Sequence, residues 1–122
     1  MNNIIYRSII LGIGDFVADV LADGILITFK QGAPSELADY CCIHSHGELT
    51  TNLAIGQTIK FGDFSYLITA IGEVATTNFR ELGHITVRFD GKRQAELAGS
   101  IHVIGQAPTG LKIGDSIIIV AN

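Results

Sequence analysis

The chain repeats itself at an offset of 58 residues. The matches fall mainly at apolar and glycine positions: Ile10 on Ile68, Ile13-Gly14 on Ile71-Gly72, Ile27-Thr28 on Ile85-Thr86, Ile43-His44 on Ile101-His102, and Leu53-x-Ile55-Gly56-x-x-Ile59 on Leu111-x-Ile113-Gly114-x-x-Ile117. One copy of this length is small for a core of its own, so residues 1–62 and 63–122 are expected to pack as a single domain. Ile and Gly are common in this chain, so a chance alignment is the alternative.

Each copy reads as a series of strands. Hydrophobic residues make up 48% of the 122 residues and charged residues 16%, and the β-branched Ile, Val and Thr favour strands. Strands are predicted at about 4–13, 24–30, 40–46, 55–61, 64–71, 84–89, 99–104 and 113–120, with glycines between them. The prediction is an all-β fold: a compact β-barrel of two pseudo-symmetric halves. One or two short helical turns are expected, including one at 33–40 capped by Ser35.

Charge and cysteine content exclude several classes of protein. The net charge is −4, and Lys and Arg are not clustered, which argues against a nucleic-acid partner. The apolar run from Ile117 to Ala121 is too short to span a bilayer, so no membrane insertion is expected. Cys41 and Cys42 are neighbours with no third cysteine, so the cytoplasm is the expected location. On a regular strand one of these two thiols would face outward.

The most reactive stretch is Ile43-His44-Ser45-His46-Gly47-Glu48-Leu49. Residues i and i+2 of a strand share a face, so His44 and His46 would present two imidazoles side by side. Imidazole serves as a base, a metal ligand and a nucleophile. His44, His46 and Glu48 together suit Zn²⁺ or Fe²⁺. The residues alone therefore support a metal site and a phosphocarrier histidine equally well. A non-catalytic ligand-binding barrel is the third possibility.

The 58-residue offset gives His44 and His46 different kinds of counterpart in the second copy. It places His102 at the position of His44, but Ile104 at the position of His46. His102 is therefore predicted to serve the scaffold, and the His44–His46 pair is predicted to be the site.

Three longer segments carry a family resemblance. They are Leu26-Ile27-Thr28-Phe29-Lys30-Gln31-Gly32-Ala33-Pro34, Tyr40-Cys41-Cys42-Ile43-His44-Ser45-His46-Gly47-Glu48-Leu49 and Asn78-Phe79-Arg80-Glu81-Leu82-Gly83-His84-Ile85-Thr86-Val87-Arg88-Phe89-Asp90-Gly91. Over nearly its whole length the chain resembles the glucitol/sorbitol-specific IIA component of the phosphoenolpyruvate-dependent sugar phosphotransferase system. The resemblance makes a metal site the lesser alternative.

The resemblance implies a phosphotransferase component without a cofactor. His44 would take a phosphoryl group from the phosphohistidine of HPr and pass it to a cysteine of the IIB component, which is coupled to polyol uptake by the membrane-bound permease. A neutral imidazole attacks without prior deprotonation. Its other nitrogen is best held by an acceptor, either a backbone carbonyl or Glu48. Nε2, as the more exposed nitrogen, is expected to carry the phosphoryl group.

Four further residues are candidates for contact with the phosphoryl group. His46 is the expected supporting partner, and His84 is the second candidate, with a surface residue at a strand start as its alternative. Gly47 would let a backbone N–H approach phosphate, although a plain turn glycine fits equally well. Arg80 would bind phosphate through its guanidinium or pair with a carboxylate such as Glu81.

Overall fold

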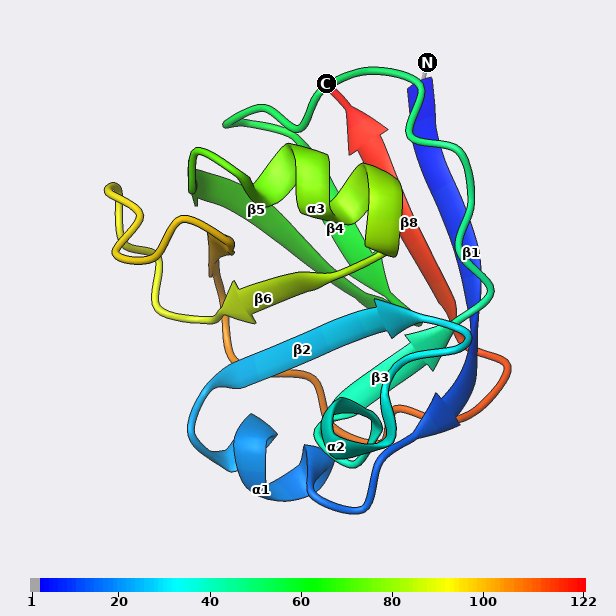
Figure 1. Ribbon diagram of the computed structural model, residues 1–122. Coiled ribbons are helices and arrows are strands. Elements are labelled where there is room, and N and C mark those ends of the chain that lie inside the picture. The colour runs from blue at the N-terminus through cyan, green and yellow to red at the C-terminus, as the bar shows by residue number, and fades with distance from the viewer. Residues whose placement is uncertain (1–2) are drawn as a thin grey trace.

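The computed structural model describes residues 3–122, which form eight strands and three short helices (Figure 1). In chain order these are β1 (Asn3–Ile13), α1 (Val17–Ala22), β2 (Ile25–Lys30), α2 (Ser35–Ala38), β3 (Cys41–His44), β4 (Thr58–Phe61), β5 (Phe64–Ile71), α3 (Ala75–Leu82), β6 (Ile85–Arg88), β7 (Ser100–Ile104) and β8 (Ser116–Ala121). The predicted β-barrel is confirmed, but with three helices instead of one or two helical turns. Ser35 is the first helical residue of α2 and not its cap, because Pro34 holds that position.

The strands close into one barrel in the order β1-β3-β2-β6-β7-β5-β4-β8. β3 pairs antiparallel with β1 and parallel with β2. In the same arrangement, β7 pairs antiparallel with β5 and parallel with β6. A register shift between Ile10 and Gly12 in β1 recurs between Ile68 and Ala70 in β5, 58 residues later. These shared irregularities support the proposal that residues 1–62 and 63–122 are copies of one unit.

The interval between equivalent residues is not 58 throughout the chain. The N–H of Gly14 donates to the carbonyl of Cys41, and the N–H of Gly72 donates to the carbonyl of Ser100. The two donors are 58 residues apart, whereas the two acceptors are 59 apart. The added residue falls between β5 and β6, in the segment that holds the longer helix, since α3 has 8 residues and α1 has 6.

This one-residue slip corrects the predicted equivalence of His44 and His102. Cys42 in β3 and Ile101 and Val103 in β7 belong to the barrel core. Because side chains alternate along a strand, a slip of one residue moves a side chain to the opposite face. By the 59-residue interval, the counterpart of His44 is Val103, and His102 lies on the outward-facing row of β7.

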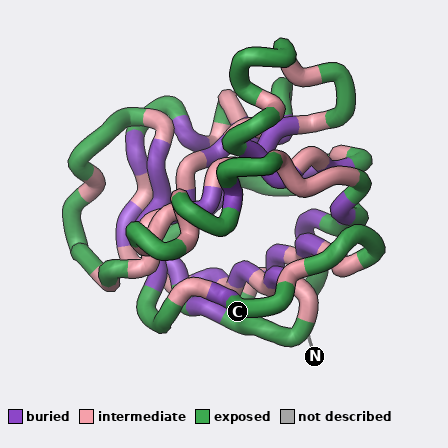
Figure 2. Tube along the Cα trace, turned by 90° about the horizontal axis from the view of Figure 1, so that it is seen from below, coloured by how far each residue is buried: buried purple, intermediate pink, exposed green. Residues whose placement is uncertain are grey.

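Buried side chains fill the interior of the barrel. Buried segments follow the strands and exposed segments follow the connections (Figure 2). The largest fully buried side chains include Tyr6, Ile10, Leu26, Ile59, Phe61, Ile68, Phe79, Ile85, Ile101, Ile117 and Ile119. In Figure 1, α3 lies over the upper part of the barrel and α1 and α2 lie near its lower end. Ala75 and Phe79 connect α3 to the core, so the end of this helix has a defined position beside β3.

Two further observations concern the cysteines and the helices. Cys41 and Cys42 are both buried, so neither thiol is exposed. Cys42 belongs to the barrel core, and its neighbour Cys41 faces the other side of β3 as expected but is covered there. None of the helices within residues 3–122 is long and apolar enough to cross a membrane.

Candidate functional site

His44 is the last residue of β3, and its side chain is fully buried. It stands two residues after Cys42, a member of the core, so its imidazole points into the same interior. The ring of Phe79 from α3 stacks with it at a centroid distance of 6.2 Å and an angle of 20°. The exposure expected for a free Nε2 is therefore absent, because the whole ring lies beneath α3.

The hydrogen bonds of His44 define its tautomer. Nε2 lies 2.8 Å from the carbonyl oxygen of Gly83. A carbonyl only accepts, so Nε2 carries the proton and donates it. Nδ1 lies 2.9 Å from the Ser8 hydroxyl and 3.3 Å from the backbone nitrogen of His46. Burial lowers the pKa of His44, a neighbouring His46 lowers it further, and the bond to Gly83 opposes them. The imidazole is thus neutral, with its lone pair on Nδ1.

His46 lies beyond the end of β3, not on it. Its φ is +62°, in the left-handed region, which ends the regular alternation of the strand. The prediction of two histidines on one strand face is therefore wrong in its geometry. Even so, the turn brings the two rings together, with centroids 5.8 Å apart and planes at 81°. His46 is near His44 as expected, but a tight backbone turn places it there.

Tyr6 connects the two histidines. Its hydroxyl lies 2.8 Å from Nδ1 of His46 and 3.3 Å from Nδ1 of His44, and it accepts the N–H of Gly47 at 3.1 Å. Ser8 supplies the hydrogen for Nδ1 of His44, so the single Tyr6 proton goes to Nδ1 of His46. One phenol therefore joins both imidazoles and the loop that follows them.

The C-terminal end of α3 holds both rings from the other side. Nε2 of His46 donates to the carbonyl of Arg80 at 2.9 Å, in the same way that Nε2 of His44 donates to Gly83. These carbonyls form the partially negative end of the helix. Glu48 is exposed. Of the two acceptors considered from the sequence, the structure thus places a backbone carbonyl on His44.

The two imidazole rings pack closely against Gly83. It ends α3 with φ +60°, and a Cβ built on it would lie 2.8 Å from Cε1 and Nε2 of His44 and 3.2 Å from Nδ1 of His46. Its carbonyl also accepts the hydroxyl of Thr28 at 2.8 Å. Only glycine combines this backbone conformation with such close packing.

Gly47 is also required by packing. A Cβ there would lie 2.3 Å from the carbonyl oxygen of Arg7 in β1. The approach of its N–H to phosphate stays a prediction. In this structure the glycine approaches β1, and the Gly47 N–H bonds to Tyr6.

The guanidinium of Arg80 and the ring of His84 have no hydrogen bond to His44 or His46 among the described residues. The Arg80 guanidinium bonds to Asn52 at 2.8 Å and not to Glu81, and only the Arg80 carbonyl reaches the site. The His84 ring packs on Phe29, with centroids 4.9 Å apart. Burial lowers the pKa of His84.

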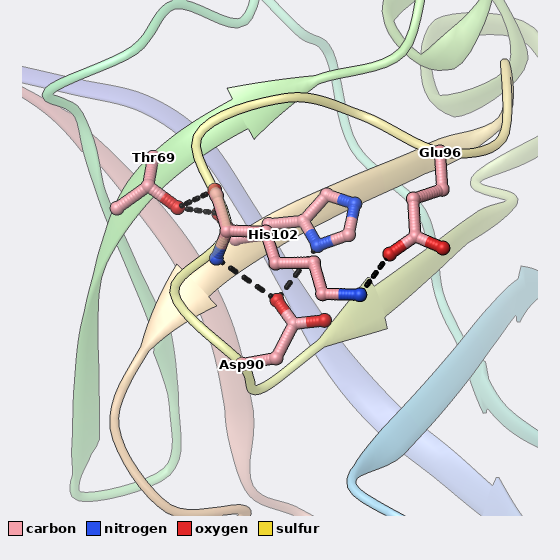
Figure 3. Close-up of polar contacts among 5 residues, drawn as sticks. Thr69, Asp90, Glu96 and His102 are labelled. Atoms are coloured by element: carbon pink, nitrogen blue, oxygen red, sulfur yellow. Dashed lines mark hydrogen bonds and ion pairs between the residues drawn. The ribbon is translucent and has the colours of Figure 1, made fainter.

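His102 is fully buried on the outward-facing row of β7, in a polar cluster whose other side chains are partly or fully exposed (Figure 3). Its Nδ1 lies 2.7 Å from Oδ1 of Asp90, and the same oxygen accepts the backbone N–H of Lys92 at 3.1 Å, in the loop that also carries Glu96. Lys92 and Glu96 form an ion pair in that loop. Within residues 3–122, Nε2 of His102 has no hydrogen-bond partner. This cluster fastens the loop to the barrel, in agreement with the predicted scaffold role.

The alternative of a metal site rests on the same two imidazoles. Residues 3–122 contain no group of three or more His, Cys, Asp or Glu side chains placed to hold one ion. Both Nε2 atoms already donate to carbonyls, and Glu48 points to solvent. The donor set therefore suits a positioned nucleophile better than a metal.

Sequence reasoning did not identify Tyr6, Ser8 or Gly83 as site residues. A signal for the first two was present in β1, where Tyr6 and Ser8 alternate with Ile10 and so share its core-facing row. Polar groups on a core-facing row need partners, which pointed to a buried polar site. The signal for Gly83 was weaker: a glycine directly after a helical stretch.

Comparisons with known proteins agree with one another. Residues 5–118 match the family model for the glucitol/sorbitol-specific IIA component of the PTS system. The glucitol/sorbitol-specific EIIA components of Shigella flexneri and Escherichia coli (strain K12) are each 47% identical over 111 residues, which cover 91% of this chain and 90% of the relative. The crystal structure of a PTS IIA component from Enterococcus faecalis V583 superposes with a TM-score of 0.86 at 24% identity. It covers 94% of this chain and 99% of the other.

Proposed function

Because this chain belongs to the family of glucitol/sorbitol-specific IIA components of the sugar phosphotransferase system, we propose that His44 is its phosphohistidine. In this proposal HPr supplies the phosphoryl group and a cysteine of the IIB component accepts it, for the uptake and phosphorylation of glucitol/sorbitol. The chain acts in the cytoplasm and needs no cofactor, because the phosphoryl group arrives bound to HPr.

The observation that carries the proposal is the neutral, fixed state of His44. A phosphocarrier histidine needs a free lone pair and a ring held in one orientation. The carbonyl of Gly83 holds the proton on one nitrogen, and burial keeps the other nitrogen unprotonated at neutral pH. Orientation and protonation state are thus both arranged before a donor arrives.

His46 supports this chemistry as a neighbour of His44. Both rings share Tyr6, so a change in charge at one is transmitted to the other. Gly47 contributes its N–H to the same group, while Arg80 contributes a carbonyl instead of its guanidinium. In the proposal, His84 has a lesser role, because its ring packs on Phe29.

Phosphorylation in a reconstituted system tests the proposal. The chain is incubated with phosphoenolpyruvate, the general transfer enzyme and HPr, and acid-labile, base-stable phosphate is measured. One phosphate per chain is expected, lost in His44→Gln and retained in His102→Gln. The control is matched, because both side chains are fully buried histidines. Labelling that survives His44→Gln would reject the site, and stoichiometric metal in the purified chain would favour the metal alternative.

A further inference from the structure

We propose that three exposed apolar side chains, Phe16, Leu37 and Tyr40, form the surface on which the phosphoryl donor docks. This assignment rests on the proposed function, in which a carrier protein must dock near His44 before the phosphoryl group is transferred. The partner face that fits has an apolar centre surrounded by Lys and Arg side chains. In the proposed function that partner is HPr.

These three residues, the aromatic patch, lie on α1 and α2 near the lower end of the barrel (Figure 1). Phe16 directly precedes α1, Leu37 lies within α2 and Tyr40 follows α2. The rings of Phe16 and Tyr40 stack with centroids 5.1 Å apart and planes at 24°. Phe16, Leu37 and Tyr40 are 43%, 42% and 46% exposed. Contiguous exposed apolar groups mark interaction sites, and aromatic side chains are common anchors of protein interfaces.

The second copy of the repeated unit shows that the fold does not require an apolar patch at this place. The N–H of Phe16 donates to the carbonyl of Asp39 at 2.8 Å, and the N–H of Val74 donates to the carbonyl of Ala98 at 3.0 Å. These two bonds align the copies, with intervals of 58 residues for the donors and 59 for the acceptors. The counterparts of the patch residues are Val74 for Phe16, Glu96 for Leu37 and Gly99 for Tyr40. Of these counterparts only Val74 has an apolar side chain, so the complete patch belongs to the copy that carries His44.

Exposed carboxylates flank the aromatic patch along the same two segments. They are Asp15, Asp19, Glu36 and Asp39. Among residues 3–122, none of the four forms an ion pair. From residue 8 to residue 40, Lys30 is the only Lys or Arg, and its amine donates to the carbonyl of Glu81 in α3. A negative rim around an apolar centre favours a partner with a basic rim and speeds its association. A second copy of this chain would bring like charges together, which disfavours self-association through the patch.

One partner can cover both the aromatic patch and the end of β3. Tyr40 directly precedes β3 and His44 ends it, a distance of about 13 Å at about 3.3 Å per residue. An interface of ordinary size buries about 800 Å² on each partner, a disc roughly 30 Å across. The exposed Ile9 of β1 extends the apolar surface to Ser45, because the Ser45 N–H donates to the Ile9 carbonyl at 2.9 Å and the Ser45 hydroxyl accepts the Ile9 N–H at 3.0 Å. A protein docked on the patch therefore also reaches the residue that follows His44.

Kinetics with the donor test the apolar part of the surface. Initial rates of phosphorylation are measured against the concentration of phosphorylated HPr for Phe16→Ala and Tyr40→Ala. Each is expected to raise KM by about 10-fold, the loss typical of an aromatic anchor, and to keep kcat, because neither ring contacts His44. Phe64→Ala, an exposed phenylalanine elsewhere on the barrel, and Val74→Ala, the counterpart of Phe16, should keep the parent KM. Melting temperatures verify that all four variants are folded.

Two results would overturn the docking surface. The first is an unchanged KM in both Phe16→Ala and Tyr40→Ala, and the second is a fall in kcat with KM unchanged. Either result, with phosphate still found on His44, would leave the proposed function standing. Absence of phosphate from His44 in the parent chain would reject the proposed function itself.

Charge reversal tests the chemistry of the partner face. Asp15→Lys lies beside the patch, and Asp63→Lys is the matched control, because Asp63 is also exposed and the change in net charge is the same. At low ionic strength Asp15→Lys should raise KM by about 3-fold to 10-fold and weaken its dependence on salt, whereas Asp63→Lys should match the parent. A lower KM in Asp15→Lys would indicate an acidic partner face and refute the proposal. Sedimentation of the parent chain as a dimer that Phe16→Ala dissociates would assign the patch to a second copy instead.

Discussion

Gly83→Ala tests the contact between the end of α3 and His44, and Gly24→Ala supplies a control. Both glycines follow a short helix in the left-handed region, with φ of +60° at Gly83 and +79° at Gly24. A Cβ at Gly83 would lie 2.8 Å from Cε1 and Nε2 of His44. At Gly24, no atom of the described residues lies within 4 Å of such a Cβ. The two variants share a backbone penalty and differ in the collision with the imidazole.

The expected losses follow from these two contributions. Alanine in the left-handed region costs about 1–2 kcal/mol, and this applies to both variants. Forcing an added methyl group against a buried ring costs about 1–3 kcal/mol more, and this applies only at Gly83. Gly83→Ala should therefore lower the free energy of unfolding by about 2–5 kcal/mol, which a domain of ordinary stability survives.

Urea unfolding and calorimetry measure the difference between the two variants. For a domain of this size about 1 kcal/mol shifts the melting temperature by about 4 °C, so Gly83→Ala should melt about 4–12 °C below Gly24→Ala. Phosphorylation should also fall in Gly83→Ala, because the methyl group displaces the His44 ring, whereas Gly24→Ala should keep the parent rate. Equal stability losses in the two variants would show that the ring does not pack on Gly83 as described.

Three other predictions concern pH, thiols and the loop after β3. Burial lowers the pKa of His44 below its ordinary 6.5, so below that pH the unfolded chain binds more protons and stability falls as the pH drops. Urea midpoints at pH 7.5 and 5.5 should show this fall, and His44→Gln should reduce it. Burial raises the pKa of Cys41 to about 11 and, with the charge of its neighbour, that of Cys42 to about 12. A thiol reagent at pH 8 should therefore label neither cysteine until the chain is unfolded. Gly47→Ala places a methyl group 2.3 Å from a β1 carbonyl and should cost about 3 kcal/mol by calorimetry; an unchanged melting point would contradict that contact.

The strands were predictable from the sequence because β-branched apolar runs between glycines are a local signal. In β5 such a run lies between Gly62 and Gly72. The letters do not show which face is buried, since Tyr66, Ile68 and Ala70 are buried whereas the equally apolar Leu67 is exposed. The prediction failed at the end of β3, where the strand was expected to continue to residue 46. His46 adopts a left-handed φ there, and tertiary contacts with Tyr6 and the Arg80 carbonyl stabilise that conformation.

The equivalence of His44 and His102 failed for a related reason. Sequence identity aligned the two histidines without a gap, yet one added residue between β5 and β6 changes the face on which the second one lies. Identity between letters does not report the direction of a side chain, because a slip of one position reverses it.

The sequence by itself determined the β class, the repeated order of strands and the pairing of two histidines two residues apart. Only the tertiary structure decided which nitrogen of His44 is free and which groups surround it. Tyr6, Ser8 and Gly83 lie 36 to 39 residues from His44 along the chain. The closed barrel and α3 bring them within hydrogen-bond distance. The physical reason is that a tautomer depends on donors and acceptors in space, and those contacts exist only after distant strands and the helix have packed.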